Sequence, residues 1–348
     1  MKTLQTLVFQ YLTLQNFIVL KSLQFKLIKC IIVRNKEVIM VKYIFKRILQ
    51  AIAVLLLVTC ITFFLMKLVP GSPFASEKAQ SPEVLEALNK KYGLDQPYHV
   101  QLKKFITNAL KGEFGVSLKM QKDRPVMDIL KEMFPTSAKL GLIALTWATI
   151  VGVTLGSLAA YHRGKKLDSF LRVLTTIGIS APGFVVATLL LLLFGVKLKV
   201  LPTMGLNGFK SYLMPCFSLG FYSMCYIARL SRSSMLDAMG QDYIRTARAK
   251  GVSEKKILFK HALKNGFIPV LTYLGPLTAG IITGSMVVES VFSVQGLGRY
   301  FINSVLNRDY PIIMATTLFF ASLVIFMNMV VDILYRFIDP RIDLSKGD

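Results

Sequence analysis

The sequence Gly240–Gly251, GQDYIRTARAKG, is polar and strongly basic, and it lies between two apolar runs that are each long enough to cross a bilayer. Its alanines and arginines are good helix formers. A membrane protein that carries such a segment between two spans exposes it to water on one side of the membrane. We therefore expect this segment to bind a partner there, while the apolar runs around it decide the fold class.

Apolar runs recur along the chain. Each reaches or approaches the roughly 20 residues that a helix needs to cross about 30 Å of hydrocarbon. Glycine and proline inside such runs are tolerated in a membrane bundle, where they permit close helix contacts and kinks. The sequence predicts an all-α membrane protein with six transmembrane helices, at residues 48–68, 140–161, 170–196, 212–230, 267–288 and 313–337.

Composition narrows the possible partners. The 348 residues are 53% hydrophobic, with a mean hydropathy of +0.54 and a formal net charge of +23. Strong basicity is typical of nucleic-acid-binding proteins, but these do not carry repeated apolar runs of about 20 residues. We therefore expect no nucleic-acid partner. The four cysteines form no CxxC pair and the three histidines lie far apart, so neither a metal site nor a disulfide framework is indicated.

The lysines and arginines are concentrated in alternate loops, which is the pattern of the positive-inside rule. The sequence therefore predicts a cytoplasmic-membrane protein with both termini in the cytoplasm. The basic residues on the predicted inner side are Lys42, Lys46 and Arg47, then Arg163, Lys165 and Lys166, then Arg229, Arg232, Arg245, Arg248, Lys250, Lys255, Lys256, Lys260 and Lys264, and finally Arg336, Arg341 and Lys346.

The connection at about residues 69–139 is too long for a simple loop. One helix is predicted from Pro82 with Ser81 as its N-cap, and a second from Tyr98 to about Leu110. We expect a small extracytoplasmic cap on the membrane domain.

The first 39 residues carry an amphipathic stripe, which fits an interfacial helix or a seventh span. A third interpretation, which we favour, is that the natural protein starts at Met40 and that residues 1–39 are an upstream extension. Residues 40–348 then form one membrane domain.

The basic loop has its own helix signals. Asp242 is placed to cap a helix from Tyr243 to about Lys250, and Gly251 then falls where a left-handed residue ends a helix. Ser253 is placed to cap a second helix, with Val252 and Ile257 offering apolar contacts at the tip. A loop that merely binds anionic lipid head groups would explain the charge but not this order of caps.

These residues resemble the EAA loop of ABC-transporter permeases, in the branch that imports peptides and nickel. That branch reads Asp-Tyr-Ile-Arg-Thr-Ala-Arg-Ala-Lys-Gly, as Asp242–Gly251 does here. Only Ala247 and Gly251 match the wider EAA consensus. Leu263 is retained in the later part of that consensus, but His261 and Lys264 replace Ile and Pro. The peptide branch shares these departures.

Other motifs extend the resemblance over about residues 40–348, closest to the oligopeptide permease B-type subunit. The chain differs from the family in having Val294-Gln295 where Trp-Pro is frequent. The matching segments are Met40–Arg47, Leu68–Phe74, Lys91–Pro97, Gly112–Gly115, Gly296–Arg299, Asn307–Pro311 and Asp339–Arg341.

The resemblance implies a type I ABC importer fold with a cytoplasmic coupling helix in the loop at about residues 229–266. It implies as partners a second homologous permease subunit, two ABC ATPase subunits, an extracytoplasmic peptide-binding protein, a peptide substrate and membrane lipid. The implied substrates are oligopeptides, with dipeptides or nickel chelates as the alternative. The residues that it assigns to ATPase coupling are Asp242, Tyr243, Arg245, Ala247, Arg248, Ala249, Gly251, Val252 and Leu263.

The chain has no phosphate-binding loop, so we expect no ATPase activity and no bound cofactor, with ATP and magnesium used by the partner subunits. No pattern typical of an intramembrane protease is present either.

A translocation pathway is predicted from residues inside the spans. Ionisable residues in a bilayer are functional candidates, but we favour a structural role for both carboxylates: Glu289 is placed to cap the junction with the loop at 295–299, and Asp332 to pair with Arg336 or another helix. The predicted pathway residues are Pro182, Gly183, Gly280, Gly284 and Glu289.

Overall fold

The computed structural model describes residues 45–68 and 82–338, with side chains described as far as residue 330. The predictions for residues 1–39, for Ser81 and for the side chain of Asp332 fall outside this part of the chain. Contacts divide the chain into two compact units, residues 1–54 with 339–348, and residues 55–338. The helices from α2 onward belong to the second unit.

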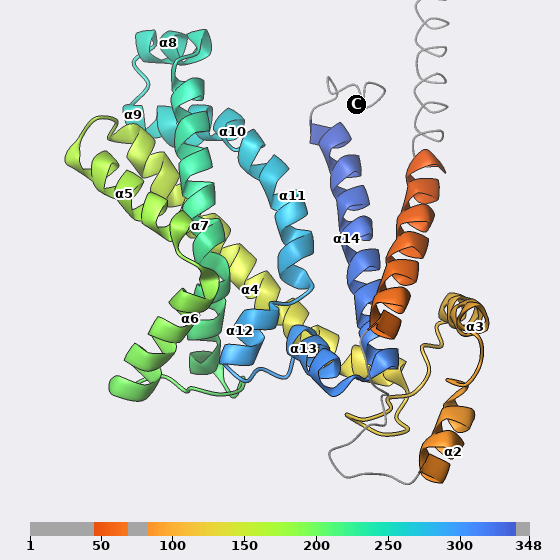
Figure 1. Ribbon diagram of the computed structural model, residues 1–348. Helices are drawn as coiled ribbons and strands as arrows, with labels where there is room; N and C mark the ends of the chain where they lie inside the picture. The colour runs from red at the N-terminus through yellow and green to blue at the C-terminus, as the bar shows by residue number, and fades with distance from the viewer. Residues whose placement is uncertain (1–44, 69–81, 339–348) are drawn as a thin grey trace, which may run out of the picture. The chain divides into compact units, whose positions relative to one another are not determined.

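The described residues are helical throughout, apart from connections and one isolated bridge between Val116 and Pro125. After the first helix, Phe45–Leu68, come α2 (Pro82–Tyr92), α3 (Tyr98–Leu110), α4 (Val126–Tyr161), α5 (Lys166–Ser180), α6 (Gly183–Leu190) with the π-helical η1 (Leu191–Lys197), α7 (Phe209–Met239), α8 (Asp242–Ala249), α9 (Glu254–Lys256), the π-helical η2 (Ile257–Ala262), α10 (Leu263–Gly266), α11 (Ile268–Ile282), α12 (Met286–Val291), α13 (Leu297–Asn307) and α14 (Tyr310–Ile338) (Figure 1).

Four helical segments are long and apolar enough to span a membrane, namely Phe45–Leu68, Val126–Tyr161, Ile268–Val291 and Tyr310–Val330. The bent pair α5 and α6–η1 makes a fifth candidate. These correspond to five of the six predicted runs. The remaining run, at 212–230, lies in α7, which has 31 residues but is less apolar than the four candidate spans.

The third predicted span, at 170–196, is not one straight helix. Its two halves meet at 102° around Ala181 and Pro182, both of which have extended backbone. Proline has no N–H to donate to the preceding turn, and it disfavours helical geometry in the residue before it. The predicted span is therefore a sharply bent pair of helices, with the break at a proline where the sequence allows a kink.

α4 and α7 cross at close backbone contact because glycines face the partner helix. A Cβ atom added at Gly152 would lie 2.8 Å from the Met224 carbonyl oxygen, and one at Gly220 would lie 2.8 Å from that of Ala144. Small residues at helix interfaces allow this approach in membranes. The Trp147 indole N–H donates to the Cys216 carbonyl at 2.9 Å and fixes the same crossing.

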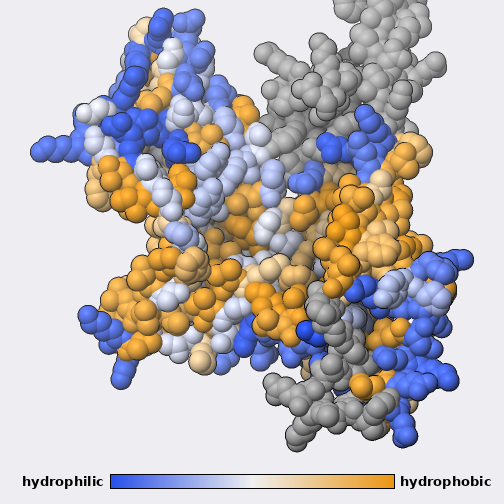
Figure 2. Space-filling view, in the orientation of Figure 1, coloured by the Kyte–Doolittle hydropathy of each residue, from blue (hydrophilic) through white to orange (hydrophobic). Residues whose placement is uncertain are grey.

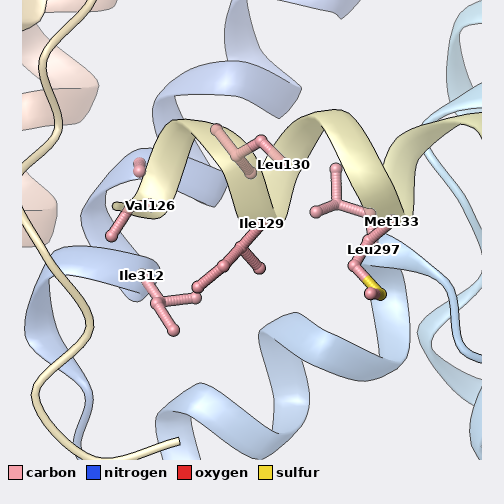
Figure 3. Packing of buried hydrophobic residues seen from close by; sticks show 7 residues of the cluster. Val126, Ile129, Leu130, Met133, Leu297 and Ile312 are labelled. Atoms are coloured by element: carbon pink, nitrogen blue, oxygen red, sulfur yellow. The ribbon is translucent and has the colours of Figure 1, made fainter. Parts of the chain in front are cut away.

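At the end of the helices remote from α8, the first turns of α4 pack against α13 and α14. Figure 3 shows this cluster, in which Ile129 of α4 points toward Ile312 of α14. Its members are buried and apolar: Val126, Ile129, Leu130, Met133, Leu297, Ile312 and Ala315. The region between residues 69 and 139 is therefore not all connecting loop, because α4 already begins at Val126.

The same end of the molecule contains the two predicted short helices. α2 starts at Pro82 and α3 runs from Tyr98 to Leu110, as predicted. The loop after α3 is tied to the start of α14 by Asp309, which is fully buried. Its carboxylate accepts hydrogen bonds from the Ser117 hydroxyl at 2.5 Å and from the N–H groups of Leu118, Lys119 and Met120 at 3.0–3.1 Å.

Candidate functional site

The predicted partner-binding loop folds as a helical elbow at the end of α7. α7 ends at Met239, α8 runs from Asp242 to Ala249, and a second helical segment, α9–η2–α10, leads from Glu254 to Gly266 (Figure 1). We call residues 240–266 the elbow. In Figure 2 its outer surface is strongly hydrophilic. The predicted helix–turn–helix is therefore confirmed in outline.

The turn of the elbow depends on Gly251. The Gly251 N–H donates to the Arg248 carbonyl at 2.9 Å, and the Val252 N–H donates to the Ala247 carbonyl at 3.2 Å. This pair of bonds is the Schellman motif, in which the residue at the glycine position adopts the left-handed conformation. Gly251 has φ +74°, as the sequence predicts, and a Cβ atom there would meet nothing within 4 Å. Backbone conformation alone therefore favours glycine.

An ion pair spans the turn from α8 to the next segment. Arg248 Nε lies 2.7 Å from Glu254 Oε1, and Nη2 lies 3.3 Å from Oε2. The hydrogen bond from Arg248 lowers the pKa of the Glu254 carboxyl, and the same bond raises the pKa of Arg248. Both side chains remain more than two-fifths exposed, so the pair contributes little to stability. It holds the charged groups in place on the surface.

The inner face of the elbow is fixed to α7 by an apolar cluster. Ile244 of α8 and Ile257 of η2 are fully buried against Met235 of α7. Where the elbow rejoins the membrane region, Ser234 donates to the Gly266 carbonyl at 2.6 Å. The elbow is therefore packed directly on the end of α7 and is not a loose loop.

The outer face leaves the charged side chains free. Arg245 and Asp242 are 75% and 95% exposed and lie 3.4 Å apart, and Tyr243 also lies at the surface. Of the predicted coupling residues, Asp242, Tyr243, Arg245, Arg248, Ala249 and Gly251 are exposed, while Ala247, Val252 and Leu263 are partly buried and pack against the apolar cluster.

Some local predictions were wrong. Asp242 does not cap α8, because it is the first helical residue and Gln241 occupies the N-cap position without a side-chain bond. Ser253 holds the N-cap position of α9, but its side chain makes no capping bond. Ile257 offers no apolar contact at the tip, because it is fully buried inside the elbow. The exposed apolar ring in this part of the elbow is that of Phe259.

Sequence reasoning did not single out the strongest polar contact near the elbow. Asp168, at the start of α5, is 1% exposed, and its carboxylate accepts two hydrogen bonds from Arg232 of α7 at 2.6 and 2.8 Å. The Gly164 N–H donates to the same carboxylate at 3.0 Å. The acidic Asp168 next to a predicted basic loop could have suggested an ion pair. Its partner could not be identified from the sequence, because Arg232 lies 64 residues later.

Glu289 of α12 is fully buried at the other end of the bundle. Its carboxylate accepts hydrogen bonds from the Ser137 hydroxyl at 2.7 Å and the Arg299 N–H at 3.0 Å. Ser137 in turn accepts from the Leu297 N–H at 2.8 Å. The carboxylate thus braces the loop that begins α13.

Of the other predicted pathway residues, three are exposed and one, Gly284, lies close to Glu289. Pro182 and Gly183 form the corner between α5 and α6, and both are exposed. Gly280 of α11 is exposed, and a Cβ atom there would meet nothing within 4 Å. Gly284 has φ +94° and lies against Glu289 and Ser137, apart from the exposed glycines.

Among the residues that the structure describes, no group of three or more His, Cys, Asp or Glu side chains is placed to hold a metal ion.

Two protein-family models match the chain. Residues 152–344 match the binding-protein-dependent transport system inner membrane component, and residues 40–141 match the N-terminal region of binding-protein-dependent transport system membrane components.

Curated relatives match over nearly their whole length. The oligopeptide transport system permease protein OppB of Haemophilus influenzae is 45% identical over 305 residues, which cover 87% of this chain and 99% of that protein. The dipeptide transport system permease protein DppB of Bacillus subtilis is 43% identical over 307 residues, with 88% and 99% covered.

A solved structure supports the fold. The MetNI methionine ABC transporter, in an inward-facing conformation, superposes with a TM-score of 0.53 at 17% identity, covering 61% of this chain and 97% of the matched chain. At this identity the similarity concerns the fold alone.

Proposed function

Because the chain belongs to the family of binding-protein-dependent transport system inner membrane components, we propose that it is the permease subunit of an ATP-driven importer that carries oligopeptides across the cytoplasmic membrane. The observation that carries this proposal is 42–45% identity to OppB proteins over 99% of their length. It does not hydrolyse ATP or bind a cofactor, and ATP and magnesium are used by partner subunits.

The proposed complex contains a second homologous permease subunit, two ABC ATPases on the cytoplasmic side and an extracytoplasmic peptide-binding protein. Both termini of this chain and its elbow face the cytoplasm. α7 is the sixth span, since it is long enough and carries the elbow at one end. Its serines are largely buried against the other helices, and its arginines, Arg229 and Arg232, are shielded from lipid by partner subunits and by α5.

The elbow is the proposed docking site for an ATPase subunit. Its outer face presents Tyr243 and Arg245, and its inner face is packed on α7. Force applied to α8 by an ATPase is therefore passed to a spanning helix instead of being absorbed by a loose loop. Closure of the ATPase dimer shifts the population of two membrane conformations through its different affinity for each.

The substrate class is tested by uptake in cells that lack their own peptide importers and that express the full set of subunits. Uptake of a labelled hexapeptide that is inhibited only weakly by unlabelled dipeptides supports the oligopeptide proposal. Uptake of dipeptides or nickel chelates with no hexapeptide uptake would replace it by the alternative. The dipeptide alternative is supported by the 43% identity to the dipeptide permease DppB of Bacillus subtilis.

The docking role is tested by Arg245→Glu, because this exposed side chain has no strong contact within the chain. We expect loss of peptide uptake and of peptide-stimulated ATPase activity, with the subunit still inserted in the membrane. Lys260→Glu, an exposed reversal on η2, is the matched control for charge. If both charge reversals reduced uptake equally, the ATPase would depend on the positive charge of the whole elbow and not on a specific contact with Arg245.

The role of Arg248 is separable from that of Arg245 by a charge exchange. Arg248→Glu breaks the ion pair with Glu254, and the double variant with Glu254→Arg restores it in the opposite sense. Recovery of uptake in the double variant would show that Arg248 acts within the elbow. Continued loss indicates that the ATPase reads the positive charge itself.

A further inference from the structure

Three tyrosine rings and one guanidinium form a continuous stack between α7 and α11. The Tyr222 and Tyr226 ring centroids are 6.4 Å apart, and Tyr226 and Tyr273 are 4.4 Å apart. The Arg229 guanidinium lies 5.7 Å from the Tyr226 ring. We call these four residues the tyrosine ladder. It joins two helices through Tyr226 and Tyr273, which are 47 positions apart in sequence.

The polar ends of the ladder have no partner within the described part of the chain. None of the three phenol hydroxyls makes a hydrogen bond there, and the Arg229 guanidinium forms no ion pair. Tyr222 and Arg229 are exposed, and Tyr226 and Tyr273 are partly exposed. Three phenol hydroxyls and one guanidinium therefore lie at an exposed or partly exposed surface without an acceptor in the described part of the chain.

Lipid is an unsuitable neighbour for this surface. Tyrosine and arginine often lie at the head-group level of a membrane. The ladder, however, extends inward from the level of Arg232, which is 22% exposed, by about 15 Å as far as Tyr222, at 1.5 Å per residue of helix. That is about half the hydrocarbon thickness, where an unsatisfied hydroxyl is costly. Figure 2 shows pale, weakly hydrophilic residues over the upper part of α7, in contrast to the orange surfaces lower in the same view.

The ladder continues along α11 toward a predicted pathway residue. Gly280 lies seven residues after Tyr273, which places it on the same face about 10 Å farther along the helix. No side chain of the described residues covers the space where a Cβ atom on Gly280 would lie. Open space at Gly280 therefore lies farther along the helix face that carries Tyr273.

From this geometry we infer that the tyrosine ladder, Tyr222, Tyr226, Arg229 and Tyr273, is a peptide-binding site on the translocation pathway. The inference rests on the proposed function. A peptide main chain supplies a series of carbonyl acceptors, and its free end supplies a carboxylate for Arg229. Aromatic faces contact side chains of many kinds, so the site reads main chain and charge in preference to a particular sequence.

Photocrosslinking in the reconstituted complex identifies what the ladder contacts. A photoreactive phenylalanine analogue replaces Tyr226, and a labelled hexapeptide is delivered by the binding protein. We expect peptide crosslinks during ATP turnover and none when the same analogue replaces Tyr161, an exposed tyrosine at the end of α4. Crosslinks from Tyr226 only to the second permease, or only to lipid, would overturn the inference.

Removal of the hydroxyl groups gives an independent measurement. Tyr222→Phe and Tyr273→Phe keep the stacked rings, and each is expected to raise the KM for peptide uptake about two- to tenfold, the effect of one lost hydrogen bond. Tyr161→Phe leaves it unchanged. Unchanged KM in both ladder variants, with wild-type peptide uptake intact, would reject the ladder while retaining the proposed function. No peptide uptake by the wild-type complex would instead reject the proposed function.

Discussion

Asp168 and Arg232 form a buried, two-bond ion pair that joins α5 to α7, with Arg232 Nε 2.6 Å from Asp168 Oδ1 and Nη2 2.8 Å from Oδ2. Two further groups, the Gly164 N–H and the Arg172 guanidinium, face the same carboxylate. The pair lies one turn before Ser234 and Met235, which hold the elbow. α5 is thus fastened to the part of α7 on which the elbow packs.

Replacing Asp168 with Asn is expected to destabilise the protein by about 3 kcal/mol, the lower end for breaking a buried pair, because Arg232 keeps some exposure to solvent. The midpoint of thermal unfolding in detergent measures this. Arg172→Gln is the control, since Arg172 is 55% exposed and 3.6 Å from the carboxylate, and it should change the midpoint little. Similar midpoints for the two variants would contradict a dominant role of Arg232.

Gly251→Ala is expected to weaken the elbow by about 1–2 kcal/mol, because a side chain disfavours the left-handed conformation. Asn adopts this conformation more readily, so Gly251→Asn should retain more peptide uptake than Gly251→Ala. Uptake rates at equal membrane abundance provide the comparison. If both variants transport normally, the turn tolerates another geometry.

The ion pair across the elbow has a defined pH dependence. Since the pKa of Glu254 is lowered in the folded elbow, the pair stabilises the turn above the ordinary carboxyl pKa of 4.5 and is lost as the pH falls through the lowered value. The contribution is small and is screened by salt, because both groups are exposed. The protection of the amides at residues 247–252, measured as exchange relative to the intrinsic rate at each pH, should fall over this acidic range in the wild type, with no such step in Glu254→Gln.

Gly296, which lies against Glu289, and Gly280, which has open space beside it, should respond differently to substitution by alanine. A Cβ atom at Gly296 would lie 2.5 Å from Glu289 Oε2 and from Ser137 Oγ, whereas one at Gly280 would meet nothing. Gly296→Ala is therefore expected to lower the thermal midpoint by several degrees. Gly280→Ala should leave the midpoint unchanged or slightly higher, since alanine favours helix over glycine. Equal midpoints would show that the loop at 296 can move without loss.

Most of the helices could be predicted because apolar length and the positions of glycine and proline are local properties. The bounds of α3 and the left-handed Gly251 are examples. A kink at Pro182 was allowed by the sequence, but the angle of 102° between the two halves depends on their packing and could not be predicted from the run itself.

The polar contacts could not be predicted in the same way. Asp168 and Arg232 are 64 residues apart, and the three tyrosines lie on two helices. Sequence patterns show which face of one helix is apolar, but not which residue of another helix lies opposite. The burial of Ile257 inside the elbow depends on the same kind of long-range packing.

The bond between Ser117 and Asp309 has a consequence for biosynthesis. The two residues are separated by 192 positions, and a ribosome adds about 5–20 residues per second, so the loop waits about 10–40 s for its carboxylate. Until then the N–H groups of Leu118, Lys119 and Met120 must be hydrated or bound elsewhere. The segment around Ser117 is therefore among the last to become ordered, and a protease acting on the nascent chain would meet it while it is still open.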